Sequence, residues 1–301
     1  MKIPAYYGFW HHLGHWLLKA SSWLVLLFLI LPILVIVPLS FNAEPFFSFT
    51  EGMLTLDPEA YSLRWYREIL DDPKWILAIK NSFFIGILST ILATILGTCA
   101  AVGLARDEMP FRRFITALLL SPMIVPLIIT AAGMFFFYSN LGLAGSYLGV
   151  ILAHAALGTP FVIITVTATL TGFDYSLARA ALNLGATPIR VFFDVIMPLI
   201  RPGVISGALF AFITSFDEVV VILFMAGPQQ RTIPRQMFSG LREQINPSIL
   251  AIATLLILLS IALLVTLELL RRRAERMRGI ETKLWRGGGH EVAHSSERPQ
   301  P

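Results

Sequence analysis

The stretch ARAALNLGATPIRVFFDVIMPLIRPG, residues 178–203, lies between two segments that are apolar enough to cross a membrane. Asp174 or Ser176 can cap a short helix that enters this stretch. Gly185 can end the helix, because glycine adopts the left-handed backbone conformation without steric cost. The spacing i, i+3, i+4, i+7 gives the helix an apolar face that consists of Leu177, Ala180, Ala181 and Leu184.

A second helix is expected directly after this corner. Thr187 followed by Pro188 is typical of a helix cap and first turn, and we expect Pro198 and Pro202 to end the helix before the next apolar segment. One face of the second helix consists of Ile189, Phe192, Phe193 and Ile196. The sequence therefore predicts two short amphipathic helices outside the bilayer, which either lie on the membrane surface or meet a partner.

The rest of the chain has the composition of an integral membrane protein. Its 301 residues are 56% hydrophobic and 14% charged, with a mean hydropathy of +0.73, whereas soluble proteins are roughly 45–50% apolar and about 25% charged. Six stretches are long enough to span a bilayer: residues 23–39, 78–104, 114–138, 147–170, 203–225 and 249–270. We expect an all-α membrane protein with six transmembrane helices and a cytoplasmic loop, residues 171–202, between spans four and five.

Basic residues set the expected orientation, because short loops rich in lysine and arginine stay in the cytoplasm. These residues gather in the loops on one side and in a tail that opens with RRRAERMR, whereas segment 41–75 is rich in acids. Residues 1–22 and the tail 271–301 are therefore expected in the cytoplasm, flanking a transmembrane domain over 23–270, with both termini inside. The net charge of +4 reflects this topology and predicts no nucleic-acid partner.

One segment disagrees with this orientation. Residues 227–247 carry Arg231, Arg235 and Arg242, yet they would lie on the outer side. Either these arginines have structural roles or the last hairpin is assigned to the wrong side.

A spacing pattern in the opening stretch resembles a known family. Ala180-Ala181 is followed after three residues by Gly185, and after nine more by Val195, Met197 and Pro198. This resembles the "EAA, three residues, G, nine residues, I-x-L-P" loop of permease subunits in type I binding-protein-dependent ABC importers. The resemblance implies that the loop couples an ATPase to the membrane helices through Leu177, Arg179, Ala180, Ala181, Leu184, Gly185 and Pro198.

The sequence departs from that pattern at two positions. Arg179 stands where the family usually has glutamate, so an ion pair made by that glutamate does not carry over. Met197 stands where leucine is usual, which is a volume-conserving change.

The resemblance covers most of the chain from about residue 61 to the end of span six. YSLRWYREIL, LTGFDYSLARAALNLGAT, SFDEVVVILFMAGP and LAIATLLILLSIALLV resemble the second permease of spermidine/putrescine importers. This implies a bacterial inner-membrane subunit that forms a heterodimer with a second permease and imports a polyamine-like cation. A periplasmic binding protein would deliver the cation to segments 41–75 and 227–247.

The energy source is expected on a separate subunit. The chain has no Gly-Lys pair and hence no P-loop, so ATP and Mg belong to a partner ATPase dimer, and this chain is expected to bind no cofactor or metal and to have no catalytic residue. One alternative is the same fold with another small solute, such as iron, a phosphonate, an opine or an amino-acid derivative. An alternative of another class is a stand-alone secondary transporter or channel, which would predict an inverted repeat that we do not find.

Two acids, Asp217 and Glu218, lie within the fifth apolar stretch. A carboxylate inside the bilayer costs several kcal/mol unless it faces a cavity or a partner, so such acids are candidates for function. We expect one of them to line the pathway of a cationic substrate. The alternative is that one or both hold the structure together through ion pairs or backbone contacts.

Other polar residues and prolines in the spans have weaker functional signals. His154 and Asn81 are expected to be hydrogen-bonded packing residues. Pro122, Pro126 and Pro160 are expected to kink or hinge their helices.

Overall fold

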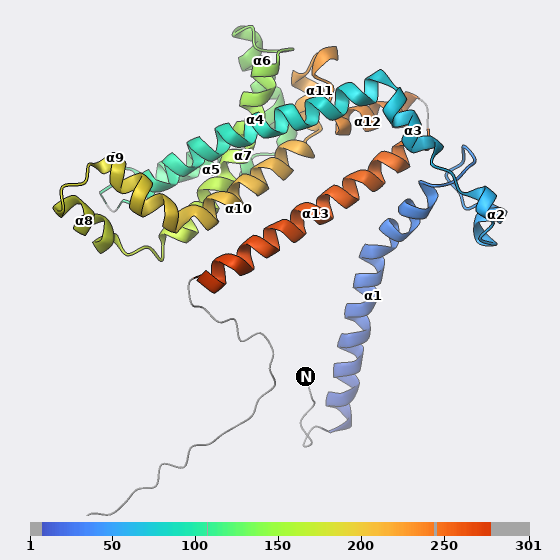
Figure 1. The fold of residues 1–301 in the computed structure, drawn as a ribbon, viewed down its shortest axis with the longest axis horizontal. Coiled ribbons are helices and arrows are strands. Elements are labelled where there is room, and N and C mark those ends of the chain that lie inside the picture. Colours follow the sequence, from blue (N-terminus) through green and yellow to red (C-terminus); the bar gives the residue numbers. More distant parts are fainter. Residues whose placement is uncertain (1–7, 107, 244–245, 278–301) are drawn as a thin grey trace, which may run out of the picture.

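The computed structural model describes residues 8–106, 108–243 and 246–277, and over these residues the chain is helical (Figure 1). The α-helices are α1 Phe9–Leu39, α2 Glu51–Leu54, α3 Arg64–Asp71, α4 Pro73–Leu104, α5 Arg112–Ile124, α6 Leu127–Asn140, α7 Tyr147–Leu170, α8 Tyr175–Asn183, α9 Pro188–Val191, α10 Met197–Phe216, α11 Val220–Met225, α12 Ile233–Glu243 and α13 Ser248–Met277. Three short turns complete the described part: η1 Pro58–Ala60, η2 Phe192–Ile196 and η3 Pro228–Gln230. The all-α prediction is confirmed.

Five stretches are long and apolar enough to cross a membrane: Phe9–Leu39, Pro73–Leu104, Tyr147–Leu170, Pro188–Phe216 and Ser248–Leu269. A sixth span results if α5 and α6 are taken together. The predicted fourth span coincides with α7. The first span extends further than expected, because α1 begins at Phe9, within segment 1–22. Of the predicted tail 271–301, residues 278–301 lie outside the described residues.

The third predicted span, residues 114–138, is not one helix. α5 ends at Ile124, α6 begins at Leu127, and the two helices are bent by 104° at the break. Val125 has an extended backbone because it precedes Pro126, which lacks an N–H group and disfavours helical geometry in the residue before it. The kink expected at Pro126 is therefore a complete interruption, whereas α7 continues through Pro160.

The expectation that Pro198 and Pro202 end the second helix of the loop is wrong. α9 continues through the π-helical turn η2 into α10. Pro198 occupies the first turn of α10, where its missing N–H group costs little, and Pro202 lies inside that helix. Loop and span are thus one continuous helical element with a local π-turn, and π-turns of this kind often lie at functional sites.

α4, α7 and α10 pack together as the core of the bundle. Small residues recur every fourth position on α10, a pattern called here the α10 small-residue ridge: Gly203, Gly207, Ala211 and Ser215. A Cβ atom on Gly207 would lie 2.5 Å from Thr165 Oγ1 and 2.8 Å from Val162 Cα of α7. The ridge therefore brings the two backbones into close approach, which is a common way for helices to associate in membranes.

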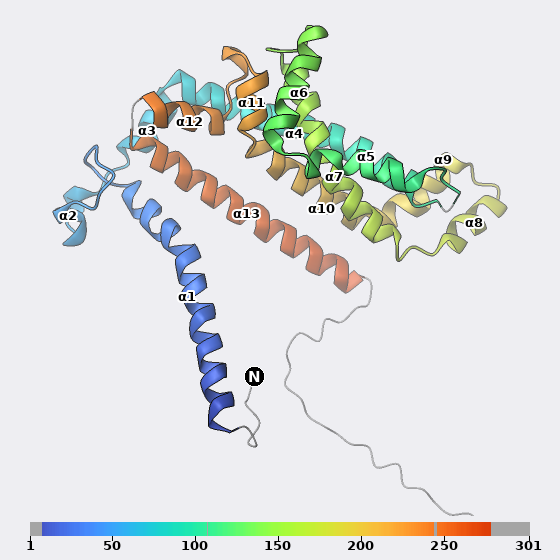
Figure 2. The same ribbon diagram turned by 180° about the vertical axis from the view of Figure 1, so that it is seen from behind.

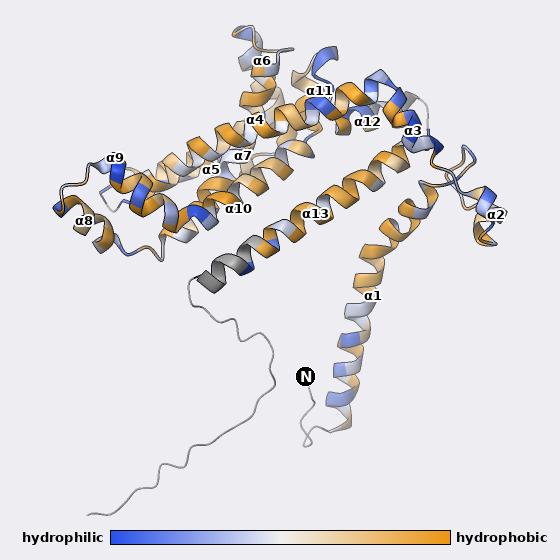
Figure 3. Cartoon of the chain, in the orientation of Figure 1, coloured by the Kyte–Doolittle hydropathy of each residue, from blue (hydrophilic) through white to orange (hydrophobic). Residues whose placement is uncertain are grey.

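α1 and α13 lie at the edge of this core. α1 packs against α13 only near one end, where Leu39, Met53 and Leu250 form a small buried cluster (Figures 1 and 2). Figure 3 shows hydrophobic residues along α4, α10 and α13, as expected for helices in lipid.

The segments between the spans gather at two ends of the bundle. α8 and α9 lie at one end, whereas α2, α3 and α12 lie at the other (Figure 1). Segments 41–75 and 227–247 therefore share an end, and Asn246 joins them by donating a hydrogen bond from Nδ2 to Glu68 Oε1 at 2.7 Å. This is the grouping that the predicted order of six spans implies, although the arginines of segment 227–247 argue against it.

Candidate functional site

Local hydrogen bonds fix the first helix of the loop. Asp174 Oδ1 accepts a hydrogen bond from the backbone N–H of Ser176 at 2.8 Å, so Asp174 is the cap of α8. Hydrogen bonding from Ser176 holds the pKa of the exposed Asp174 carboxyl below its ordinary value. This favours the charged form of the cap at neutral pH.

Gly185 closes α8 as the sequence predicts. Its φ is +89°, in the left-handed region that favours glycine, and the N–H groups of Gly185 and Ala186 donate to the carbonyl oxygens of Leu182 and Ala181 at 2.9 and 3.1 Å. A Cβ atom at this position would meet nothing within 4 Å. The need for glycine here is therefore conformational and not steric.

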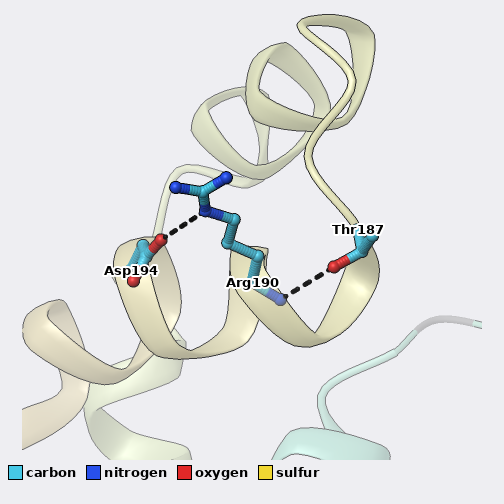
Figure 4. A network of polar contacts seen from close by, with 3 residues as sticks. All are labelled: Thr187, Arg190 and Asp194. Atoms are coloured by element: carbon cyan, nitrogen blue, oxygen red, sulfur yellow. Dashed lines mark hydrogen bonds and ion pairs between the residues drawn. The ribbon is translucent and has the colours of Figure 1, made fainter.

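The second helix begins at the predicted cap. Thr187 Oγ1 accepts a hydrogen bond from the Arg190 N–H at 3.4 Å, and Arg190 Nε lies 3.3 Å from Asp194 Oδ2 one turn later (Figure 4). Both charged side chains are exposed, so the ion pair is screened by water and contributes little to stability. The caps, not this ion pair, define the corner between α8 and α9.

The apolar side chains of this loop are uncovered in the isolated chain. Leu184 is 89% exposed and Leu177 is 49% exposed, while Ala178 is buried. Ile189 and Phe193 after the corner are also exposed, at 72% and 61%. We call the exposed set the α8–α9 surface: Leu177, Leu182, Leu184, Ile189 and Phe193. The predicted contact residues Arg179 and Ala180 are exposed beside it, and Ala181 is half-buried.

Asp217 and Glu218 do not lie on a continuous helix, and the prediction of one span over 203–225 is wrong here. α10 ends at Phe216 and α11 begins at Val220. Glu218 is 8% exposed, and its Oε1 accepts a hydrogen bond from the Val221 N–H at 2.9 Å. Because the carboxylate satisfies a free backbone donor of α11, Glu218 has a structural role.

Asp217 is placed differently from its neighbour. It is exposed and stands directly after the last residue of α10. The free carbonyl groups at the end of a helix carry partial negative charge, and the carboxylate adds to it. This position can attract a cation.

The arginines of segment 227–247 have structural contacts. Arg235 Nη1 donates to the carbonyl oxygens of Ala226 and Gly227 at 2.9 and 2.8 Å, at the end of α11. Arg231 Nη1 donates to Gln236 Oε1 at 2.8 Å. Of the two hypotheses for this segment, the contacts of Arg231 and Arg235 support the one that gives its arginines structural roles. The side chain of Arg242 lies outside the described part.

A group of polar side chains that the sequence analysis did not predict joins segment 227–247 to the helical core by hydrogen bonds. Asn81 Nδ2 donates to the carbonyl oxygens of Gln229 and Arg231 at 2.7 and 2.9 Å, and the Tyr147 hydroxyl lies 3.0 Å from Asn81 Oδ1. Ser82 Oγ accepts from the Ile233 N–H at 2.8 Å. Asn81 is thus a packing residue as predicted, as is His154, whose Nδ1 lies 2.8 Å from Ser215 Oγ.

Comparison with known proteins identifies the family. The family model described as "binding-protein-dependent transport system inner membrane component" matches residues 94–276, which include α8, α9 and Asp217. The chain belongs to this family. This permease is accordingly a multi-pass inner-membrane protein and a transport subunit, not an enzyme.

Named relatives of this permease include polyamine permeases. The spermidine/putrescine transport system permease protein PotC of Haemophilus influenzae is 30% identical over 255 residues, covering 85% of this chain and 96% of that protein. The putrescine transport system permease protein PotI of Escherichia coli K12 is 35% identical over 241 residues, covering 76% and 82%. The sulfoquinovosyl glycerol transport system permease protein SmoH of Agrobacterium fabrum is 30% identical over 199 residues, covering 64% and 70%.

Solved structures support the same fold. A bacterial ABC transporter involved in the import of the acidic polysaccharide alginate matches with a TM-score of 0.70 at 17% identity, covering 88% of this chain and 99% of that one. The alginate transporter in complex with its alginate pentasaccharide-bound periplasmic protein matches with a TM-score of 0.61 at 17% identity, covering 89% and 98%. The permease therefore has the fold of an ABC importer subunit.

Proposed function

We propose that this permease and a second permease subunit form the translocation pathway of an ATP-driven importer, and that an ATPase dimer docks on the loop 171–202. The observation that carries the proposal is the α8–α9 surface, a set of exposed apolar side chains on both sides of a corner fixed by Asp174, Gly185 and Thr187. ATP and Mg would be bound by the ATPase. Because ligands shift a conformational equilibrium only through contacts that differ between states, this corner would transmit closure of the ATPase to α10.

The proposed docking of the ATPase on loop 171–202 also sets the orientation of the permease in the membrane. The end of the bundle that carries α8 and α9 would face the cytoplasm, together with both termini, and the end that carries α2, α3 and α12 would face the periplasm. The periplasmic binding protein would dock on segments 41–75 and 227–247. Arg231 and Arg235 form hydrogen bonds within segment 227–247. Exposed acids such as Asp71 would therefore provide more of the charge that guides recognition of the binding protein.

A polyamine-like cation, spermidine or putrescine, is the cargo that we propose. The relatives PotC and PotI are named for these cations, and Asp217 places an exposed carboxylate at the negative end of α10. The attraction between a carboxylate and a cation is strong where the surrounding dielectric is low. Glu218 is not assigned to the pathway, because its carboxylate caps α11.

A second candidate function is that of an importer permease with the same fold that transports a different solute. SmoH is named for a different solute and is also 30% identical to this permease, so this level of identity is compatible with other cargoes. A stand-alone secondary transporter or channel is disfavoured by the family match over residues 94–276.

The function is tested by isolating the complex and measuring transport. The chain, tagged at its C-terminus, would be purified in mild detergent from its native membrane, and the co-purifying proteins identified by mass spectrometry. We expect an ATPase and a second permease, and ATP-dependent uptake of labelled putrescine or spermidine in liposomes supplied with the binding protein. A homo-oligomer that moves substrate without ATP would contradict the importer, whereas ATP-dependent uptake of another solute alone would contradict only the cargo.

Asp217→Asn is expected to lower polyamine uptake about tenfold at saturating binding protein, because the substitution removes the charge and keeps the shape; about 1.4 kcal/mol of lost attraction corresponds to this factor. The measurement is the initial rate of labelled spermidine uptake in liposomes. The neighbouring Glu218→Gln serves as the control, since it should lower the amount of folded protein more than the uptake per folded complex. Unchanged uptake in Asp217→Asn would show that Asp217 does not act on the pathway.

A further inference from the structure

The break between α10 and α11 sets the position of the Asp217 carboxylate. α10 ends at Phe216 and α11 begins at Val220, and no proline or glycine lies between them. The free backbone groups at a helix end are commonly satisfied or held by side chains. The contacts of the residues on both sides of Asp217 therefore decide where its carboxylate stands.

A buried hydrogen bond joins the last turn of α10 to α7. Ser215 Oγ lies 2.8 Å from His154 Nδ1. His154 is 1% exposed and Ser215 is 5% exposed, so water does not compete for this bond. α7 is a single helix from Tyr147 to Leu170 and packs along α10 in the core. The bond therefore fixes the final turn of α10 against a continuous helix.

Two further contacts hold the neighbours of Asp217. Before the break, the centre of the Phe216 ring lies 5.2 Å from the centre of the Phe83 ring of α4. After the break, Glu218 Oε1 accepts the hydrogen bond from the Val221 N–H. Asp217 is exposed between these two buried residues. Its carboxylate is thus presented by a backbone that is held on both sides.

Histidine is a costly residue at position 154. Its Nδ1 bonds to Ser215, but its buried Nε2 has no hydrogen-bond partner in the part of the chain that the structure describes. Burying a polar nitrogen without a hydrogen bond costs free energy, which an aliphatic side chain of similar size would avoid. Packing alone therefore does not account for histidine at this position, whereas the bond to Ser215 does.

We propose that His154 is a positioning residue of the cation pathway, which fixes the end of α10 through Ser215 and so the place at which Asp217 meets the substrate. This role rests on the proposed function, in which Asp217 attracts a polyamine-like cation. His154 does not touch the substrate, because its side chain is buried within the chain. A carboxylate that is already held in place loses less conformational entropy when it binds a cation.

The first test compares uptake with stability. The double variant His154→Leu/Ser215→Ala replaces both members of the hydrogen bond by apolar groups, an exchange that is nearly neutral for folding. We expect the initial rate of labelled spermidine uptake per folded complex in liposomes to fall about fivefold, in the range of one lost hydrogen bond. The thermal unfolding midpoint in detergent should stay close to that of the wild type.

Single substitutions at His154 test the geometry of the bond. His154→Asn should retain most of the uptake, because the asparagine amide can bond to Ser215 from a place close to that of Nδ1. His154→Gln should not, because its amide lies farther from the backbone, near the place of Nε2. Equal uptake in the two variants would contradict a role that depends on the bond from Nδ1.

Ser89→Ala is the matched control. Ser89 of α4 is also buried, and its Oγ donates to the Ile151 carbonyl oxygen at 3.2 Å, so this bond joins α4 to α7 and not to α10. We expect Ser89→Ala to leave uptake per folded complex unchanged, even where it lowers the unfolding midpoint. A loss of uptake as large as that of the double variant would show that any loosening of the core has this effect, and would overturn the proposal.

A mutant cycle tests the route through Asp217. If His154 acts through Asp217, then His154→Leu/Ser215→Ala should lower uptake no further in an Asp217→Asn background. A purely structural effect would multiply with that of Asp217→Asn. Unchanged uptake in Asp217→Asn alone would contradict the pathway role of Asp217 and this proposal with it. Multiplied losses, or wild-type uptake in His154→Leu/Ser215→Ala while Asp217→Asn is impaired, would overturn only the positioning role.

Discussion

Replacing Gly185 by valine is expected to lower both substrate-stimulated ATP hydrolysis and uptake at least tenfold in the assembled importer, while membrane insertion stays intact. The reason is conformational, because φ is +89° at this corner and a residue with a Cβ atom loses about 1–2 kcal/mol there, with β-branched residues losing more. Since open space surrounds Gly185, the change acts on the direction of the chain between α8 and α9 and not on packing. The measurements are ATPase activity and uptake in liposomes.

A matched control lies in the same loop. Gly172 also has nothing within 4 Å of a Cβ atom, but its φ lies outside the left-handed region, so Gly172→Val should leave coupling nearly unchanged. Gly185→Asn should retain more activity than Gly185→Val, because asparagine tolerates the left-handed conformation better. Normal coupling in Gly185→Val would contradict a role for the corner in transmitting ATPase movement.

Gly207→Ala is expected to destabilise the folded chain by about 1–3 kcal/mol, the usual cost of overpacking. The added methyl group would lie 2.8 Å from Val162 Cα, a backbone atom that moves only with α7. Alanine is the better helix former by up to about 1 kcal/mol, so a loss of stability shows that close packing dominates. The measurement is the thermal unfolding midpoint of the purified chain in detergent.

Gly133 of α6 provides the comparison for this substitution. A Cβ atom at Gly133 meets nothing within 4 Å, so Gly133→Ala should be neutral or stabilising. If Gly207→Ala unfolds at the same temperature as Gly133→Ala or above it, then the α10 small-residue ridge does not require glycine.

The local features of the loop were predictable from the sequence because they depend on neighbouring residues. Asp174, Gly185 and Thr187 act as the cap, corner and second cap through hydrogen bonds that span no more than five residues. Apolar length likewise predicted the spans, and the bounds of α7 agree with it. The α10 small-residue ridge was also present in the sequence, as small residues at every fourth position from Gly203 to Ser215.

The breaks and the long-range contacts were harder to predict. Hydropathy measures how apolar a segment is but not the direction of its chain, so 114–138 and 203–225 were each predicted as one span. Pro126 gave a local signal for the first break, whereas no proline or glycine marks the break at Asp217. The contact of Asn81 with Gln229 joins residues 148 positions apart, and no local pattern indicates it.

The measurement that tests the central claim most directly is cross-linking from the α8–α9 surface to the ATPase. Leu184, which is 89% exposed, is replaced by cysteine in a Cys99→Ala background and labelled with a photoactivatable maleimide in the assembled complex. Leu54→Cys in α2, at a position that is 73% exposed at the opposite end, is the control. We predict an ATPase adduct from Leu184→Cys and none from Leu54→Cys. Absence of the adduct from Leu184→Cys, or equal adducts from both positions, would contradict docking of an ATPase on residues 171–202.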